Sequence, residues 1–196
     1  MESECRTLIV ALRLLTYMSI RDQIQMRLES GELRSVAPLM QGTRVRELYL
    51  SKDIFSRIDG PWEDISYERR FGRLRADLER FVTGGHIVAC LVPYKAKTAY
   101  MGKLDAEEIW DIRSQDPRPG LRVFGRFAGR DVFIGLGWAP RSRDWAGKNP
   151  LGPRDSQEWK VEIAQCKREW HRLLHPYRPL EGNELGDYLS GNCSII

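Results

Sequence analysis

The segment LRVFGRFAGRDVFIGLGW, residues 121–138, constrains the fold more than any other part of this chain. Apolar residues alternate with other residues on both sides of Gly129-Arg130, and a glycine-first pair is typical of the tight turn that joins two antiparallel strands. The segment therefore predicts a β-hairpin in which Ala128 lies opposite Asp131. In this register, one face is the predicted core and carries Leu121, Val123, Phe127, Val132, Ile134, Leu136 and Trp138.

The opposite face of the predicted hairpin carries Arg122, Phe124, Arg126, Phe133, Gly135 and Gly137. Glycine has no side chain to pack in a strand, so two glycines opposite arginine and phenylalanine indicate a shallow, open floor. Guanidinium groups bind phosphate bidentately, and aromatic rings stack on bases. This face is therefore a candidate surface for an anionic, planar partner. The structural alternative is that Phe124 and Phe133 pack beneath the N-terminal segment and that the glycines mark β-bulges.

The stretch EEIWDIRS, residues 107–114, predicts a strand beside the hairpin. Its alternation points Trp110 and Ile112 toward the core, which places Asp111 and Arg113 on the same face as Arg122. This face is rich in positive charge, because residues 113–154 contain nine Lys/Arg against three acidic residues. Such a local excess favours an anionic partner.

Apolar residues at helical spacing predict three further elements. A short helix begins at Ser19, whose spacing to Asp22 is that of a capping box, and ends at Gly31. A longer one, capped by Ser66, has the seam Tyr67, Phe71, Leu74, Leu78 and Phe81. The last begins at Asp155 or Ser156, ends before Pro176, and has the seam Trp159, Ile163, Cys166, Trp170 and Leu173. Residues 43–51 and 86–92 predict strands.

Composition places the chain among soluble globular proteins, with hydrophobic residues at 42% and charged residues at 30%. Its apolar runs are too short to cross a bilayer, so no membrane association is predicted. The four cysteines lie far apart with no C-x-x-C pair, which predicts neither a zinc site nor a disulfide framework. Reduced thiols fit a cytoplasmic location. No motif for a cofactor or a metal is present, and none is predicted.

Four segments together resemble, in order, the elements of the RelE/ParE toxin superfamily: EIWDIRS, GLRVFGRF, RDVFIGLGWAPRSR and the helix EWKVEIAQCKREWHRLL. MGKL, residues 101–104, is similar to the lysine-containing lead into the first of them. The resemblance implies an α+β fold, in which an antiparallel β-sheet meander packs against helices. It implies a RelE-like domain over 43–175, an N-terminal helical extension over 1–42 and a flexible tail over 176–196.

The same resemblance implies a toxin-like RNA-binding protein of a toxin–antitoxin system, acting as a ribosome-dependent mRNA endoribonuclease. Its partners would be RNA or the ribosome and an antitoxin protein. Arg122 would hold the scissile phosphate, Arg141 would neutralise developing charge, and Arg113 matches the arginine of the family's W-E-L-R strand. Asp111 is a candidate general base from its own chemistry, although a carboxylate beside arginines is more often a buttressing ion pair. Lys103, Phe124, Arg126, Phe133 and Arg143 would contact the nucleic acid.

Two departures from the family pattern favour an alternative function. Ile109 and Asp111 stand where ribonucleolytic members often carry lysines, and Trp145 stands near the position of a tyrosine or histidine. Because arginine is a poor proton shuttle, these residues favour a noncatalytic protein- or nucleic-acid-binding module on the same fold. A third hypothesis for the function is that the protein is a relative of the toxins that poison DNA gyrase.

Overall fold

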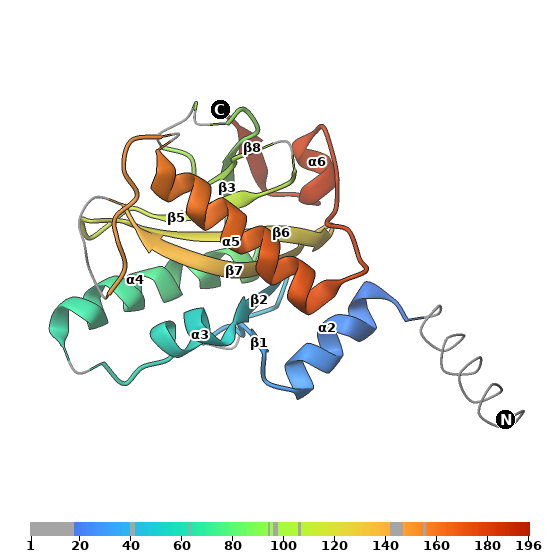
Figure 1. The fold of residues 1–196 in the computed structure, drawn as a ribbon, viewed down its shortest axis with the longest axis horizontal. Helices are drawn as coiled ribbons and strands as arrows, with labels where there is room; N and C mark the ends of the chain where they lie inside the picture. The colour runs from blue at the N-terminus through green and yellow to red at the C-terminus, as the bar shows by residue number, and fades with distance from the viewer. Residues whose placement is uncertain are drawn as a thin grey trace, which may run out of the picture.

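A mixed β-sheet runs through the molecule, with helices on both of its faces (Figure 1). The computed structural model describes residues 18–39, 42–62, 64–93, 95, 98–105, 107–141, 147–154 and 156–196. The helices are α2 (Ile20–Glu29), α3 (Lys52–Ile58), α4 (Ile65–Val82), α5 (Gln157–Leu174) and α6 (Leu185–Tyr188). The strands are β1 (Leu33–Ser35), β2 (Glu47–Ser51), β3 (Ile87–Cys90), β4 (Met101–Lys103), β5 (Trp110–Ser114), β6 (Leu121–Gly129), β7 (Val132–Pro140) and β8 (Cys193–Ile195).

The sheet has eight strands within the described residues, in the order β1-β2-β7-β6-β5-β4-β3-β8. The predicted antiparallel meander is present as β4, β5, β6 and β7. The complete sheet is mixed, because β2 pairs in parallel with β7, and β3 pairs in parallel with both β4 and β8. The prediction of strands and helices packed together is confirmed at this level, and the sheet that contains the antiparallel strands is mixed as a whole.

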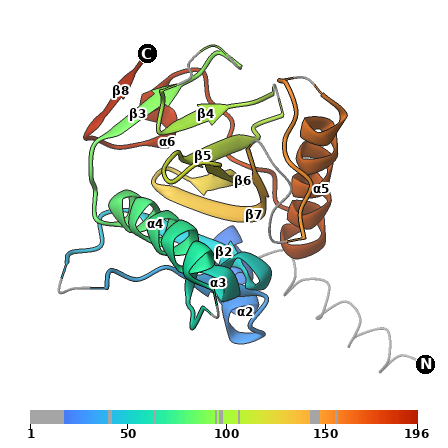
Figure 2. The same ribbon diagram turned by 90° about the vertical axis from the view of Figure 1, so that its left-hand side faces the viewer.

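Apolar side chains fill both faces of the sheet. One buried cluster packs Trp110, Phe127 and Trp138 against α3, α4 and α6. The other packs Phe124, Ile134 and Leu136 against α2 and α5. Figure 2 shows α4 and α5 on opposite sides of the strands. Because each face is covered, burial of apolar surface stabilises the sheet from both sides.

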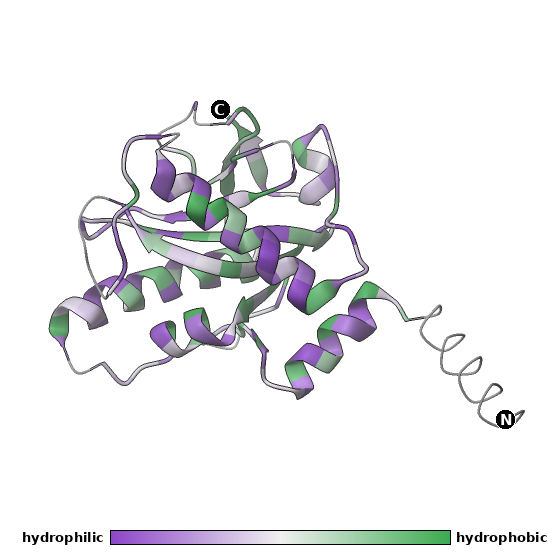
Figure 3. Ribbon diagram, viewed as in Figure 1, coloured by the Kyte–Doolittle hydropathy of each residue, from purple (hydrophilic) through white to green (hydrophobic). Residues whose placement is uncertain are grey.

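The three helices predicted from apolar spacing are confirmed. The helix α2 begins with the predicted Ser19–Asp22 capping box. The helix α4 buries Phe71, Leu74, Leu78 and Phe81, although its N-cap is Asp64, which accepts a hydrogen bond from the Ser66 amide. The helix α5 buries most of its predicted seam, including Trp159, Cys166 and Trp170. Hydrophilic residues alternate with apolar ones along these helices (Figure 3), as expected when a single face is buried.

The register of the β6–β7 hairpin differs from the predicted one. Gly129 pairs with Val132, so the turn residues are Arg130 and Asp131. Asp131 has a φ of 62°, a left-handed conformation that aspartate tolerates better than most residues. Because side chains alternate along a strand, the shift moves residues to the other face. Val132, Ile134 and Leu136 therefore lie on the α5 side, and Phe133 and Gly135 lie on the α4 side with Phe127.

The glycines of the hairpin lie where the strand register shifts and where neighbouring side chains pack closely against the backbone. The register shifts between Phe124 and Gly125, which face Gly137 and Gly135 respectively. A Cβ atom on Gly135 would lie 2.7 Å from Cδ2 of Leu50 and 2.9 Å from Cγ1 of Val123. The glycines thus mark a bulge and admit neighbouring side chains, in agreement with the structural alternative to an open floor.

Residues 176–196, which we expected to be loosely attached, pack onto the rest of the chain. Tyr188 is fully buried beside Trp110, with ring centroids 4.8 Å apart. Its hydroxyl group donates to the Glu108 carboxylate and lies 2.7 Å from the Gly182 carbonyl oxygen. Burial, reinforced by the bond to Glu108, raises the pKa of Tyr188. The strand β8 completes the sheet edge next to β3.

Replacing Tyr188 with phenylalanine is expected to destabilise the fold by about 1–3 kcal/mol, because buried Glu108 loses a hydrogen-bond donor. Urea unfolding measures this loss. Tyr49→Phe is the matched variant, because the Tyr49 hydroxyl donates at 2.7 Å to Glu47, whose side chain is 30% exposed. We expect a smaller loss there, since water can replace the donor; equal losses would contradict the docking of the C-terminal segment.

No helix within the described ranges is long and apolar enough to cross a membrane.

Candidate anion-binding site

Four of the predicted site residues meet at one end of the sheet. Asp111 and Arg113 lie on β5, and Arg113 pairs directly with Arg122 on β6. Arg141 follows β7, whose last residue Pro140 pairs with Leu121. Nε of Arg113 donates to both Asp111 carboxylate oxygens, at 2.9 and 3.1 Å, and Nη1 of Arg122 lies 3.4 Å from Asp111 Oδ2. One buried carboxylate therefore serves two guanidinium groups.

A glycine on the neighbouring strand makes room for this ion pair. Gly102 on β4 pairs with Asp111. A Cβ atom on Gly102 would lie 3.2 Å from Asp111 Oδ1 and would overlap Nη2 of Arg113. The absence of a side chain on Gly102 therefore lets the Arg113 guanidinium lie flat on the sheet beside Asp111.

Arg141 is held in place from three directions. Its backbone amide donates to the Gly120 carbonyl oxygen at 2.7 Å. Its Nη1 donates to the carbonyl oxygens of Leu151 and Gly152, at 3.0 and 2.8 Å. The guanidinium carbon lies 5.8 Å from the centre of the Trp159 ring, within the range of a cation–π interaction. These contacts position Arg141 before any ligand arrives.

Positive charge is in excess at this end of the sheet. Burial lowers the pKa of Arg122 to about 10; Asp111 opposes the shift, and the nearby Arg113, Arg141 and Arg154 add to it. Burial also lowers the pKa of Arg154, and Arg113 and Arg141 lower it further. We call these four arginines with Asp111 the arginine cluster. Arg154 was not predicted as a site residue, and the only signal for it was its place in the basic stretch 113–154.

A cavity of about 370 Å³ adjoins the arginine cluster. Arg118, Arg122 and Arg141 supply its positive charge, and its other lining residues are Ser114, Gln115, Pro119 and Gly120. Arg122 is only 9% exposed, and its Nη1 lies 3.4 Å from Asp111, farther than the 2.9 Å bond that Asp111 accepts from Arg113. A buried guanidinium that lines a cavity and shares its carboxylate with a second arginine favours an anionic ligand.

The second face of the hairpin is not an open floor. Asp111, Arg113, Arg122 and Phe124 share that face as predicted, but α5 covers it. Phe124 is fully buried, with its ring 5.7 Å from that of Trp159. The physical reason is that this face also carries Ile134 and Leu136, whose apolar surface is stabilised by burial under a helix. The sheet face therefore offers no platform for stacked bases.

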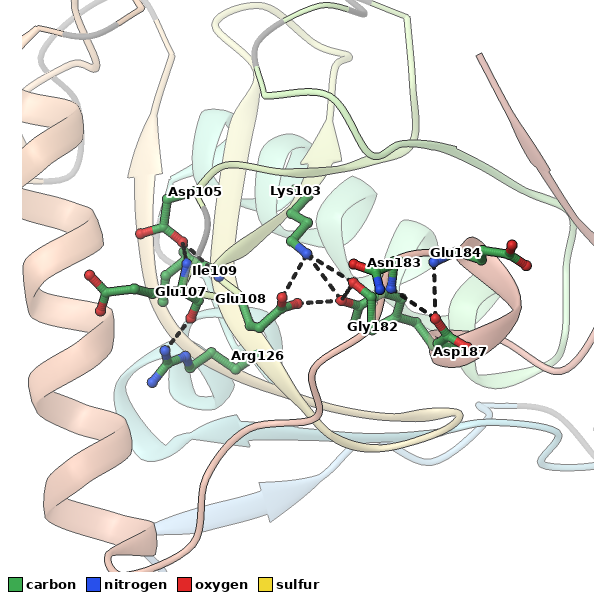
Figure 4. A network of polar contacts seen from close by, with 11 residues as sticks. Lys103, Asp105, Glu107, Glu108, Ile109, Arg126, Gly182, Asn183, Glu184 and Asp187 are labelled. Carbon is green, nitrogen blue, oxygen red and sulfur yellow. Dashed lines mark hydrogen bonds and ion pairs between the residues drawn. The ribbon is translucent and has the colours of Figure 1, made fainter.

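The other predicted nucleic-acid contacts are dispersed. Arg126 lies under α5 over the Trp170 ring, 5.6 Å from its centre, and donates to the Glu107 carbonyl oxygen (Figure 4). Phe133 is buried on the opposite face, 5.1 Å from Phe127. Lys103 pairs with Glu108 at 2.6 Å beside Tyr188. Arg143 lies outside the described residues. Among the described residues, the arginine cluster is therefore the place where predicted site residues come together.

Proton-transfer groups are scarce at the arginine cluster. The Asp111 side chain is 1% exposed and accepts the two bonds from Arg113. His86 contacts Asn192 and Ser194, while His171 and His175 lie against each other with ring centroids 4.5 Å apart. Within the described part of the chain, no histidine lines the cavity. The arrangement can bind and neutralise an anion, but Asp111 is not placed to exchange protons with it.

Neither the known protein-family models, nor the curated proteins, nor the solved structures contain a match to this chain. The arginine cluster is therefore interpreted from its own geometry.

Proposed function

We propose that this protein is an RNA-binding protein related to the RelE/ParE toxins, which holds RNA by its phosphates in the arginine cluster without cutting the chain. The observation that carries the proposal is that Arg113 and Arg122 share the single carboxylate of Asp111, while Arg122 and Arg141 line the adjoining cavity. Guanidinium groups in excess of acids attract phosphate and bind it through paired donors.

The order of the helices and strands supports the proposed relationship to the RelE/ParE toxins. The strand β2 leads into the helical pair α3 and α4, and the antiparallel strands β4 to β7 lead into α5. The resemblance to the RelE/ParE superfamily predicts this order. An antitoxin partner and a cytoplasmic location belong to the same proposal.

Binding is favoured over cleavage by the state of Asp111. A general base must reach the proton that it removes, and Asp111 is enclosed by the guanidinium of Arg113. The arginines can stabilise charge, yet they do not shuttle protons near neutral pH. The endoribonuclease remains the second candidate, because the same cluster would stabilise a charged transition state.

Replacing Arg118 or Arg141 with alanine is expected to weaken RNA binding and its salt dependence. Each lost phosphate contact should reduce the slope of log K against log salt by about 0.7 for single strands. Fluorescence anisotropy with a labelled single-stranded RNA, between low and physiological salt, measures both quantities. Arg168→Ala is the matched control, because Arg168 is an exposed arginine on α5 that bonds to Gln165.

The same samples decide between binding and cleavage. We expect the RNA to stay full length on a denaturing gel after incubation with the protein, with or without ribosomes. Shortened RNA that disappears with Arg141→Ala would support the endoribonuclease instead. RNA binding at this site would be refuted by an affinity that does not change with salt and is equal in the wild type, Arg118→Ala and Arg141→Ala.

A further inference from the structure

Contacts on both sides of the sheet fix residues that line the cavity beside the arginine cluster. On the α4 side, Nη1 of Arg70 donates to the carbonyl oxygens of Pro117 and Pro119, at 3.2 and 2.9 Å. On the α5 side, Arg141 binds the carbonyl oxygens of Leu151 and Gly152. The β5–β6 connection and residues 151–152 are thus both anchored to the body of the protein.

The inner wall of the cavity is charged and buried. Arg122 lines it, and the Asp111–Arg113 ion pair lies behind Arg122. Asp111 is shared with Arg113, so it compensates only part of the charge of Arg122. At the rim, Gln115 and Arg118 are exposed. A ligand that neutralises the charge of Arg122 must therefore place its own negative charge inside the cavity, beyond Gln115 and Arg118.

We propose that this cavity binds the terminal phosphate of an RNA chain, rather than a phosphate within the chain; this inference rests on the proposed function. A phosphodiester inside a chain carries one negative charge and two free oxygens, and the chain continues from it in two directions. A terminal phosphate monoester carries between about 1.5 and 2 negative charges at pH 7 and has three acceptor oxygens.

Covalent connectivity also favours the chain end. The sheet surface next to the cavity is closed, because Leu121 and Val123 are buried on the α4 side and Phe124 is buried under α5. On these sides of the described sheet, a chain that entered the cavity would meet buried side chains rather than an open groove. A terminal phosphate needs only one exit, and Arg118 and Gln115 at the rim are placed to meet the nucleotide attached to it.

The experiment compares three RNA oligomers of one sequence, labelled internally: one with a 5′-phosphate, one with a 3′-phosphate and one with hydroxyl groups at both ends. We expect one of the phosphate-ended oligomers to bind about tenfold more tightly than the hydroxyl-ended one at the same salt, from charge-assisted hydrogen bonds to the added phosphate. Arg122→Gln should remove this preference. Adenosine monophosphate and inorganic phosphate, added as competitors, should displace the phosphate-ended oligomer at lower concentrations than they displace the hydroxyl-ended one.

Arg122 is buried, so its variant is first checked for folding by circular dichroism. Arg118→Ala, at the exposed rim, is the second variant, and a reduced preference is expected there too. Equal affinity for all three oligomers would overturn this inference and leave RNA binding intact. A preference that survives both variants would also overturn it, because the terminal phosphate would then bind elsewhere. Failure of every oligomer to bind would overturn the proposed function itself, even if adenosine monophosphate binds.

Discussion

Replacing Asp111 with alanine is expected to destabilise the fold by about 3–5 kcal/mol, because Arg113 and Arg122 would lose the buried carboxylate that they share. Asp111 is fully buried, and both guanidinium groups lie within ion-pair distance of it. The free energy of unfolding in urea at pH 7 measures the effect. Asp116→Ala is the matched control, because Asp116 is exposed in the loop after β5. We expect the control to change stability by no more than about 0.5 kcal/mol.

The Asp111 variants also separate the two candidate functions. Asp111→Asn keeps the shape of the side chain and removes its charge. If the cluster only binds RNA, the folded fraction of this variant should bind at least as tightly as the wild type, because the net positive charge has increased. If Asp111 is a general base, RNA cleavage should be lost while binding persists. Loss of RNA binding in a folded Asp111→Asn variant would contradict the expectation that net charge governs binding, and would mean that the Asp111 charge is needed to position the arginines.

Replacing Trp159 with alanine is expected to cost about 3–5 kcal/mol of stability, as large-to-small changes at buried aromatic residues do. Trp159 is 2% exposed and packs its ring against Phe124. Its indole Nε1 donates to the Gly152 carbonyl oxygen at 3.2 Å, and Gly152 also accepts from Arg141. The substitution therefore removes core packing and loosens the Gly152 contact that holds Arg141 beside the cavity. Urea unfolding and RNA anisotropy on the same samples measure both consequences.

Trp159→Phe is the matched variant for this prediction. Phenylalanine retains an aromatic ring against Phe124 but cannot donate to Gly152, so we expect a smaller loss of stability than for alanine. Because most of the packing is retained, the RNA affinity of Trp159→Phe measures what the hydrogen bond to Gly152 alone contributes to RNA binding. A Trp159→Ala protein as stable as the wild type would mean that α5 does not cover this face of the sheet, and the open floor predicted for the hairpin would be restored.

Local patterns in the amino-acid sequence determined several features of this protein correctly. Alternation along residues 107–114 placed Trp110 and Ile112 in the core, and Asp111 and Arg113 on the face of Arg122. Helical spacing identified α4 and α5 with most of their buried residues. These predictions succeeded because a period of two or of 3.6 residues is a property of the local backbone, and it fixes which residues share a face.

The tertiary structure decided the rest. Local sequence did not reveal that Asp131 would adopt a left-handed conformation and move the turn by one residue, which transferred Phe133 to the other face. Nor did it show that α5 would cover the arginine face, or that the charge of Arg154 would lie near Arg122 and Arg141. Periodicity specifies which residues share a face; the register, and the partner that covers the face, depend on packing between segments distant in the chain.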